Sequence, residues 1–304
     1  MMKPVHMVLA GCGYTGRALA RRLQAEDVAV SALVASDASR DRLLRMGIHA
    51  RCLDLDAEDV NTGDTAPVFP QRFALAYMVP PSSKTLTDKR LSRFLKHLPE
   101  RVERFVYIST TGVYGDQDGQ RVTENTPVAP ASARAQRRVD AEHQVQRWCA
   151  RHTVPWAILR TPGIYGPGRL PLDAIKARRP VITPAEASPG NRIHRDDLAM
   201  IIHQALTDVH LQGVINVGDG NHMNTSEFTL KVAELAGLAP PPCVSRARMR
   251  QLASHRRWSF LAESREVDTT RLQHLLQHPL RFADPIAGIR ASLPGTPTDS
   301  EAES

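Results

Sequence analysis

Short apolar runs alternate with longer amphipathic segments along most of the chain. Seven runs are rich in apolar and β-branched residues: VHMVLA, VAVSALVA, IHARCLDL, FALAYMV, RFVYIST, WAILRTP and VINVG. Apolar runs of this length, separated by helix-like segments, are typical of the buried strands of a parallel sheet. The pattern therefore predicts an α/β protein with a doubly wound parallel sheet and helices on both faces.

Two of the intervening segments show helical periodicity. In TDKRLSRFLKHL, residues 87–98, apolar residues recur at i, i+3, i+4 and i+7 after a Thr or Asp that can cap a helix. A second helix is expected over residues 132–152, with three arginines in its first turns and an apolar stripe further along. Both helices are expected to pack one face on the sheet.

The pattern changes after about residue 165, where turns containing Pro and Gly separate short helices. Residues 1–165 are expected to form the main domain, rejoined by a strand near residues 191–218. Residues 166–293 are expected to form mainly a smaller C-terminal lobe that binds substrate. The segment 294–304 has almost no apolar residues and several acids, so it is predicted to be a disordered tail.

Charge and cysteine content restrict the class of protein. The formal charge is +7, but the basic residues are scattered, which favours a solvated basic surface or a site for an anionic ligand over a nucleic-acid binder. The four cysteines lie far apart and form no Cys-x-x-Cys pair, so no metal site is expected. Reduced thiols and the lack of a long apolar run predict a cytoplasmic protein that does not enter membranes.

The stretch GCGYTG follows the first apolar run and precedes a helix-like segment. Gly11 would allow a tight turn, Gly13 would let the backbone approach a pyrophosphate, and Gly16 would let the helix pack closely on the strand. A plain structural turn is the alternative. The candidate cofactor ligands here are Gly11, Cys12, Gly13, Tyr14, Thr15 and Gly16.

The end of the second apolar run bears on the choice of cofactor. In ALVASDASRDR, Ser36 and Arg40 could hold the 2′-phosphate of NADP, whereas Asp37 could bind a ribose hydroxyl or cap the next helix. A solvent-facing role for Arg40 also remains open. NADP is therefore the favoured cofactor, and NAD remains possible.

The motifs FVYISTTGVYGD, LRTPGIYGPG and NRIHRDDLA occur in this order along the chain. With them the sequence resembles the extended short-chain dehydrogenase/reductases of the NAD-dependent epimerase/dehydratase family, from the first strand to about residue 293. The resemblance implies a Rossmann-type fold and an oxidoreductase or epimerase activity on a small carbonyl or hydroxyl compound. Proteins that resemble this one often form dimers through the helices that flank the fifth strand, so a homodimer is possible.

The same resemblance assigns further residues to the cofactor and to the substrate. Asp54 would lie beside the adenine, and Ala76 and Pro80 would border the cofactor near the fourth strand. Tyr165 and the turn after it would lie near a small and possibly anionic substrate. The residues implied to approach the nicotinamide are Thr161, Pro162, Gly163 and Ile164.

The catalytic residues only partly follow the family pattern. Thr110 matches the Ser or Thr that hydrogen-bonds the reacting oxygen, although capping of the strand end is an alternative. Where the family has Tyr-x-x-x-Lys, this chain reads RAQRR, with Arg134 in the Tyr place and Arg138 in the Lys place. A guanidinium with a pKa above about 12 does not exchange protons near neutral pH, so Arg134 is a poor acid or base. The chain therefore looks like an atypical member of the family.

Several roles stay open at this point. Arg138 could reach a ribose, a phosphate or an anionic substrate, or it could be an ordinary solvated residue. Tyr77, Tyr114 or Tyr165 could replace the missing phenol, with packing against the sheet edge as the alternative for each. His194 precedes a helix that Asp196 or Asp197 could cap, and a structural role is favoured over catalysis. The whole protein could be an enzyme or a non-catalytic NADP(H)-binding protein.

Overall fold

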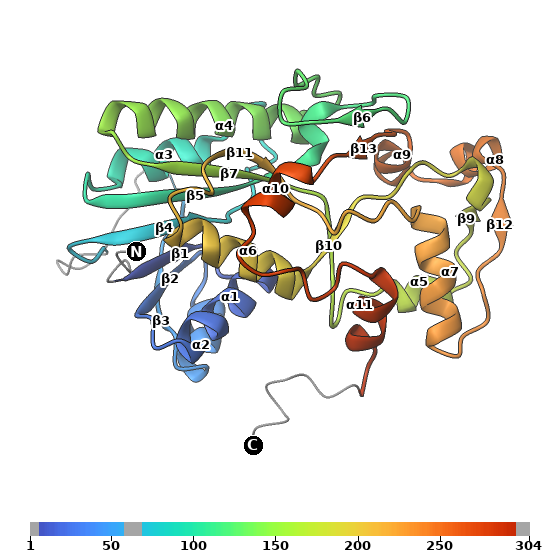
Figure 1. Cartoon of the computed structure of the whole chain (residues 1–304), viewed down its shortest axis with the longest axis horizontal. Helices are drawn as coiled ribbons and strands as arrows, with labels where there is room; N and C mark the ends of the chain where they lie inside the picture. The colour runs from blue at the N-terminus through green and yellow to red at the C-terminus, as the bar shows by residue number, and fades with distance from the viewer. Residues whose placement is uncertain (1–5, 58–68, 296–304) are drawn as a thin grey trace.

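The computed structural model describes residues 6–57 and 69–295, and its centre is one parallel sheet of seven strands (Figure 1). From edge to edge the strands are β11 (Gly213–Asn216), β7 (Trp156–Thr161), β5 (Val102–Thr110), β4 (Phe73–Tyr77), β1 (Met7–Ala10), β2 (Val30–Val34) and β3 (His49–Cys52). Each of the seven apolar runs supplies one strand, so the predicted doubly wound α/β fold is confirmed. Val5, the first residue of the first run, lies outside the described residues.

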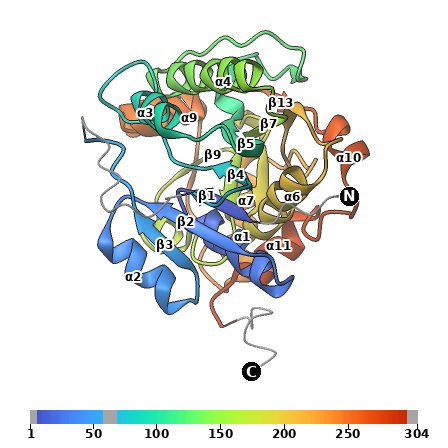
Figure 2. The same cartoon turned by 90° about the vertical axis from the view of Figure 1, so that its left-hand side faces the viewer.

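Helices cover both faces of the sheet (Figures 1 and 2). The helices on one face are α1 (Tyr14–Ala25), α2 (Asp37–Arg45) and α6 (Arg195–Thr207), and those on the other face are α3 (Lys89–His97) and α4 (Ala133–His152). Leu91 and Phe94 of α3 are buried with Val145 of α4 against the second face, which confirms both expected helices and their apolar stripes. Burial of such stripes provides most of the stability of helices of this length.

A smaller lobe lies beyond the carboxyl ends of the strands (Figure 1). Its paired strands are β8 (Gly163–Tyr165) with β10 (Arg192–His194), and β9 (Val181–Ile182) with β12 (Cys243–Val244). Its helices are α5 (Leu172–Lys176), α7 (Thr225–Leu235), α8 (Arg246–Leu252), α9 (His255–Leu261) and α11 (Pro285–Ser292). Tyr165, Phe228 and Ile289 pack together in its core.

The remaining short elements connect the lobe to the sheet. After β5 comes the 3-10 turn η1 (Thr111–Tyr114), then β6 (Arg121–Val122), which pairs with β13 (Glu266–Val267). Helix α10 (Thr270–Leu275) follows β13, and its Leu272 packs in the same core cluster as Ile215 of β11. Within the described ranges no helix is long and apolar enough to cross a membrane. Residues 296–304 of the expected tail lie outside the described residues.

Candidate cofactor and substrate site

The glycine turn between β1 and α1 has a different constraint at each glycine. Gly11 has φ +87°, and an added Cβ would lie 2.9 Å from the backbone nitrogen of Val79. A Cβ on Gly13 would meet nothing within 4 Å, so this backbone faces open space. A Cβ on Gly16 would lie 3.1 Å from the Gly11 carbonyl oxygen. The turn therefore combines a left-handed residue, an open approach and a close contact between helix and strand.

Within the described part of the chain, no side-chain cap occupies the N–H groups at the N-terminus of α1. The N-cap is Gly13, which makes no side-chain cap hydrogen bond, and the first turn contains no acidic residue. The first N–H groups of a helix have no partner within the helix and carry the positive end of its dipole. Such a terminus is suited to binding a phosphate.

A cavity of about 340 Å³ opens beside this terminus at the carboxyl edge of the sheet. Five of the residues expected to bind cofactor line it: Gly11, Cys12, Gly13, Asp54 and Pro80. The structure thus brings together the glycine turn and the ends of β3 and β4, which are far apart in sequence. Tyr14, Thr15 and Gly16 do not line the cavity.

Tyr14 instead connects the glycine turn to the smaller lobe. Its hydroxyl donates to the carbonyl oxygen of Pro167 at 2.9 Å. The guanidinium groups of Arg169 and Arg195 lie 3.9 and 5.2 Å from the centre of its ring. Both cations therefore lie within the distance at which the electron-rich face of an aromatic ring attracts a positive charge.

The polar wall of the cavity differs from the one expected at the end of β2. Ser36 caps α2 by accepting from the Ser39 backbone N–H at 3.4 Å. Arg40 is paired with Asp37 at 2.6 Å and with Asp41 at 2.9 Å, and neither Ser36 nor Arg40 lines the cavity. The cavity is bordered instead by Arg17, Ser39 and Arg42.

Ser39 and Arg42 are three positions apart, and this spacing places both on one face of a helix. The same spacing could have identified, from the sequence, the face of α2 that borders the cavity. Ala76 also lies away from the cavity, because it is fully buried in β4 and packs in the core. Met78 and Val79, the next residues along the chain, line the cavity in its place.

Arg90 also lines the cavity, and it was not predicted from the sequence. Its guanidinium binds both carboxylate oxygens of Asp56, with 2.8 Å from Nε to Oδ1, and donates to the Pro80 carbonyl oxygen at 2.9 Å. This hydrogen bonding lowers the pKa of the Asp56 carboxyl. Arg90 therefore ties the loop after β3 to the loop after β4.

Thr110 ends β5 and opens η1. Its Oγ1 accepts from the Gly112 backbone N–H at 3.2 Å, as an N-cap does, which leaves its own O–H free to donate. Both the capping alternative and a ligand role are compatible with this geometry. In register, Thr110 lies opposite Thr161 of the neighbouring β7, whose hydroxyl donates to the Leu159 carbonyl oxygen at 3.2 Å.

A buried polar network lies directly behind Thr110. Ser109 donates to Glu142 at 2.5 Å, and Glu142 forms an ion pair with Arg160 at 2.8 Å. The Arg160 guanidinium lies 4.8 Å from the centre of the Tyr114 ring, and the Tyr114 hydroxyl donates to Asn216 at 2.7 Å. Tyr114 is fully buried, and burial raises its pKa.

The two arginines at the places of the family Tyr and Lys are both engaged with the protein. Arg138 donates to the Tyr107 hydroxyl at 2.9 Å and to the Ile108 carbonyl oxygen at 2.8 Å. Arg134 donates to the hydroxyl and carbonyl oxygens of Ser259 at 2.9 and 3.0 Å, and its guanidinium lies 3.7 Å from the centre of the Phe260 ring. Arg138 thus holds β5, whereas Arg134 holds α9.

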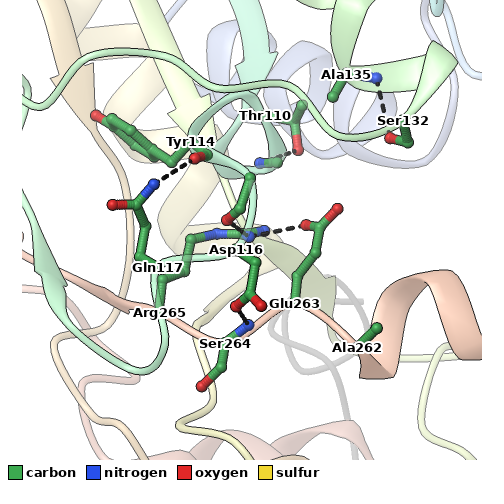
Figure 3. A network of polar contacts seen from close by, with 12 residues as sticks. Thr110, Tyr114, Asp116, Gln117, Ser132, Ala135, Ala262, Glu263, Ser264 and Arg265 are labelled. Atoms are coloured by element: carbon green, nitrogen blue, oxygen red, sulfur yellow. Dashed lines mark hydrogen bonds and ion pairs between the residues drawn. The ribbon is translucent and has the colours of Figure 1, made fainter.

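A segment of the smaller lobe docks on the loop that follows Thr110 (Figure 3). The Ser264 backbone N–H donates to Asp116 at 2.7 Å. Arg265 donates to the Gly115 carbonyl oxygen and, at 2.8 Å, to Glu263. This contact joins segments some 150 positions apart and could not be predicted from the sequence, because neither segment has a regular pattern.

The residues after β7 belong to the strand pair of the smaller lobe. Gly163 and Ile164 form β8 with Tyr165, and Thr161 to Ile164 do not line the 340 Å³ cavity. Tyr165 packs edge-on against His194 and Phe228, with ring centres 5.2 Å apart in each case. Among the described residues its buried hydroxyl has no hydrogen-bond partner, and burial raises its pKa.

His194 has a structural position in the described fold. Its Nδ1 accepts from the Asp196 backbone N–H at 3.2 Å, so His194 itself caps α6, in place of the expected Asp196 or Asp197. Its Nε2 lies 3.2 Å from the Ser292 hydroxyl of α11. Burial lowers the pKa of His194 to about 4, so the ring is neutral near pH 7.

Comparison with known proteins finds a family model that matches part of the chain. Residues 85–218, from before α3 to the turn after β11, match the model of the NAD dependent epimerase/dehydratase family. The match covers less than half of the chain.

Individual relatives are similar over most of their length. Protein YeeZ of Escherichia coli K12 is 26% identical over 249 residues, which are 79% of this chain and 86% of YeeZ. A functionally unknown conserved protein of Silicibacter pomeroyi DSS has a solved structure that is 27% identical, with a TM-score of 0.75 over 94% of this chain and 97% of that chain. The solved structure of human epimerase family protein SDR39U1 with NADPH shares the fold at 16% identity, with a TM-score of 0.68 over 94% and 98% of the two chains.

Proposed function

We propose that the chain is a cytoplasmic NADP(H)-dependent oxidoreductase or epimerase-like enzyme that acts on a small carbonyl or hydroxyl compound. The observation that carries the proposal is the cavity of about 340 Å³ that the glycine turn, the uncapped start of α1 and three arginines border together. The backbone at Gly13 has room for a pyrophosphate, and the first N–H groups of α1 would bind it. When bound, the cofactor would supply or accept a hydride at its nicotinamide ring.

The charges around the cavity favour NADP over NAD. Arg17 and Arg42 line it and, within the described residues, make no ion pair, so both charges remain available to a ligand. Ser39 adds a hydroxyl to the same wall. A phosphate between two guanidinium groups gains charge-assisted hydrogen bonds that a ribose hydroxyl does not provide.

Thr110 is the residue proposed to orient the reacting oxygen of the substrate. It lies at the carboxyl edge of the sheet, the edge that carries the glycine turn, and its O–H is free to donate. The phenols of Tyr77, Tyr114 and Tyr165 are buried, so solvent is the proposed source of the proton. Replacing Thr110 by Ala should then reduce turnover strongly without weakening cofactor binding.

A second candidate function is a non-catalytic protein that binds NADP(H). The contacts of Arg134 with α9 and of Arg138 with β5 favour this function. The two arginines stand where the family has its Tyr and Lys, and both contacts hold parts of the fold together. Stabilisation by NADPH without turnover of any substrate would support this function, and turnover that depends on Thr110 would exclude it.

The first test is a fluorescence titration with NADPH and NADH in parallel. Gly13→Val should abolish binding of both nucleotides, because its side chain would enter the open space at the turn. Arg42→Gln should lower the affinity for NADPH by roughly 10-fold or more, which is the effect of losing a hydrogen bond to a charged group. The affinity for NADH should be unchanged. Arg45→Gln, on the same helix but outside the cavity wall, is the matched control. Absence of binding by the unmodified protein would refute both candidate functions.

A further inference from the structure

A second cavity, of about 220 Å³, lies in the smaller lobe between α5, β9, α7 and the α8–α9 pair. No residue assigned above to the cofactor lines it. Much of its wall is hydrocarbon, contributed among others by Val181, Ile182, Met249, Phe260 and Leu261. Concave, mostly apolar cavities with a few polar groups are typical binding sites for small molecules.

Two arginines, Arg179 and Arg257, also line this cavity. Arg257 is half-buried and donates to the Pro180 carbonyl oxygen at 2.7 Å, whereas Arg179 is exposed at the rim. Burial and the nearby charge of Arg179 lower the pKa of the Arg257 guanidinium. Over the described ranges neither guanidinium forms an ion pair with a carboxylate. Two adjacent uncompensated cations repel each other, and an anion between them would relieve that repulsion.

The other polar groups of the wall do not neutralise this pair. Glu263 lines the cavity, but its carboxylate is bound to Arg265 at 2.8 Å. The side chains of Thr225 and Ser226, in the first turn of α7, also line it and add hydroxyl groups. The cavity therefore offers positive charge and hydroxyl groups together with apolar surface, which suits a molecule with one anionic end and one hydrocarbon end.

We propose that this cavity binds a small organic acid, with a carboxylate or phosphate monoester head between Arg179 and Arg257 and a hydrocarbon body against Phe260 and Leu261. Planar guanidinium groups bind both head groups through paired hydrogen bonds. The ligand would also touch the residue that supports Arg134, because Phe260 lies directly beneath that guanidinium at 3.7 Å. Binding of the acid requires no cofactor, so the proposal goes beyond the proposed function and can fail or stand independently.

The test is isothermal titration calorimetry of the full chain with hexanoate, hexyl phosphate, inorganic phosphate and uridine diphosphate, all without cofactor. Hexanoate or hexyl phosphate should bind at least 10-fold more tightly than inorganic phosphate, and the better of the two identifies the head group. Arg179→Gln and Arg257→Gln should each weaken that binding by roughly 10-fold or more. Arg250→Gln, an exposed arginine of α8 outside the cavity, is the matched control and should bind as the unmodified protein does.

Three outcomes would overturn the proposal. These are no binding of either hexyl compound at millimolar concentration, binding that neither arginine variant weakens, and uridine diphosphate binding more tightly than both hexyl compounds. Because Arg257 also contacts Pro180, the exposed Arg179 variant gives the cleaner result, and its thermal unfolding should match that of the unmodified protein. NADPH titration of Arg179→Gln should be unchanged, which separates a failure here from a failure at the cofactor cavity.

Discussion

Replacing His194 by Asn should change how the stability of the protein depends on pH. The ordinary pKa of a histidine is 6.5, and burial lowers that of His194 to about 4. Between these values the unfolded chain binds a proton that the folded chain does not bind. The free energy of unfolding contributed by His194 is therefore fully present above pH 6.5 and is lost as the pH falls toward 4.

The size of the effect follows from the same pair of values. A pH of 5 lies 1.5 units below the ordinary pKa of 6.5, so the histidine of the unfolded chain is protonated. The histidine of the folded chain, with a pKa of about 4, is still mostly neutral. Each unit corresponds to about 1.4 kcal/mol, so the fall from pH 7 to pH 5 costs about 2 kcal/mol. Asn keeps an acceptor for the Asp196 backbone N–H, so the variant retains a cap on α6 but has no group that titrates.

The assay is urea unfolding of both proteins at pH 7 and at pH 5. The loss of stability between the two pH values should be about 2 kcal/mol smaller in His194→Asn, even though the variant is less stable overall. Asp219, whose pKa burial raises to about 7, acts in the opposite direction, but it does so in both proteins and cancels. The control is the same substitution at an exposed histidine, His255→Asn. An identical pH dependence in the variant and the unmodified protein would refute the reasoning.

Three further variants test the site. Gly11→Ala should lower the free energy of unfolding by at least about 1–2 kcal/mol, because φ is +87° and its Cβ would crowd Val79; an unchanged melting temperature would contradict this. Glu142→Ala should cost about 3–5 kcal/mol in urea unfolding, since the buried Arg160 loses its partner; a cost below 1 kcal/mol would contradict the ion pair. Arg90→Gln should lower the affinity for NADPH in a fluorescence titration and change the free energy of unfolding little. Equal affinity in the variant and the unmodified protein would exclude a role for the contact between Arg90 and Asp56 in cofactor binding.

The strands and the glycine turn could be predicted because their signals are local. A buried parallel strand needs an unbroken apolar run, and the turn needs glycine where φ is positive, as at Gly11. The side of the cavity formed by α2 was predicted less well. Ser36 and Arg40 have suitable chemistry, but capping and ion pairs with Asp37 and Asp41 engage them, whereas Arg42 lies on the face that borders the cavity.

The contacts that the smaller lobe makes with the sheet domain could not be predicted from the sequence. Arg134 was identified as a departure from the family pattern, yet nothing near it in sequence indicates that Ser259 and Phe260 bind it. The docking of Ser264 on Asp116 likewise joins two irregular segments. Such pairings depend on where the whole chain places its loops, and neither apolar periodicity nor turn residues carry that information.

The route of the chain between sheet and lobe bears on how the protein can move. It passes from β7 into β8, returns from β10 into α6, leaves again after β11 and comes back through β13 into α10. Several separate connections therefore join the sheet and the lobe, and a rotation of one part against the other has to change the backbone of all of them together. The arrangement thus makes the relative orientation of the sheet and the lobe a property of several segments far apart in the sequence, and no single loop sets it.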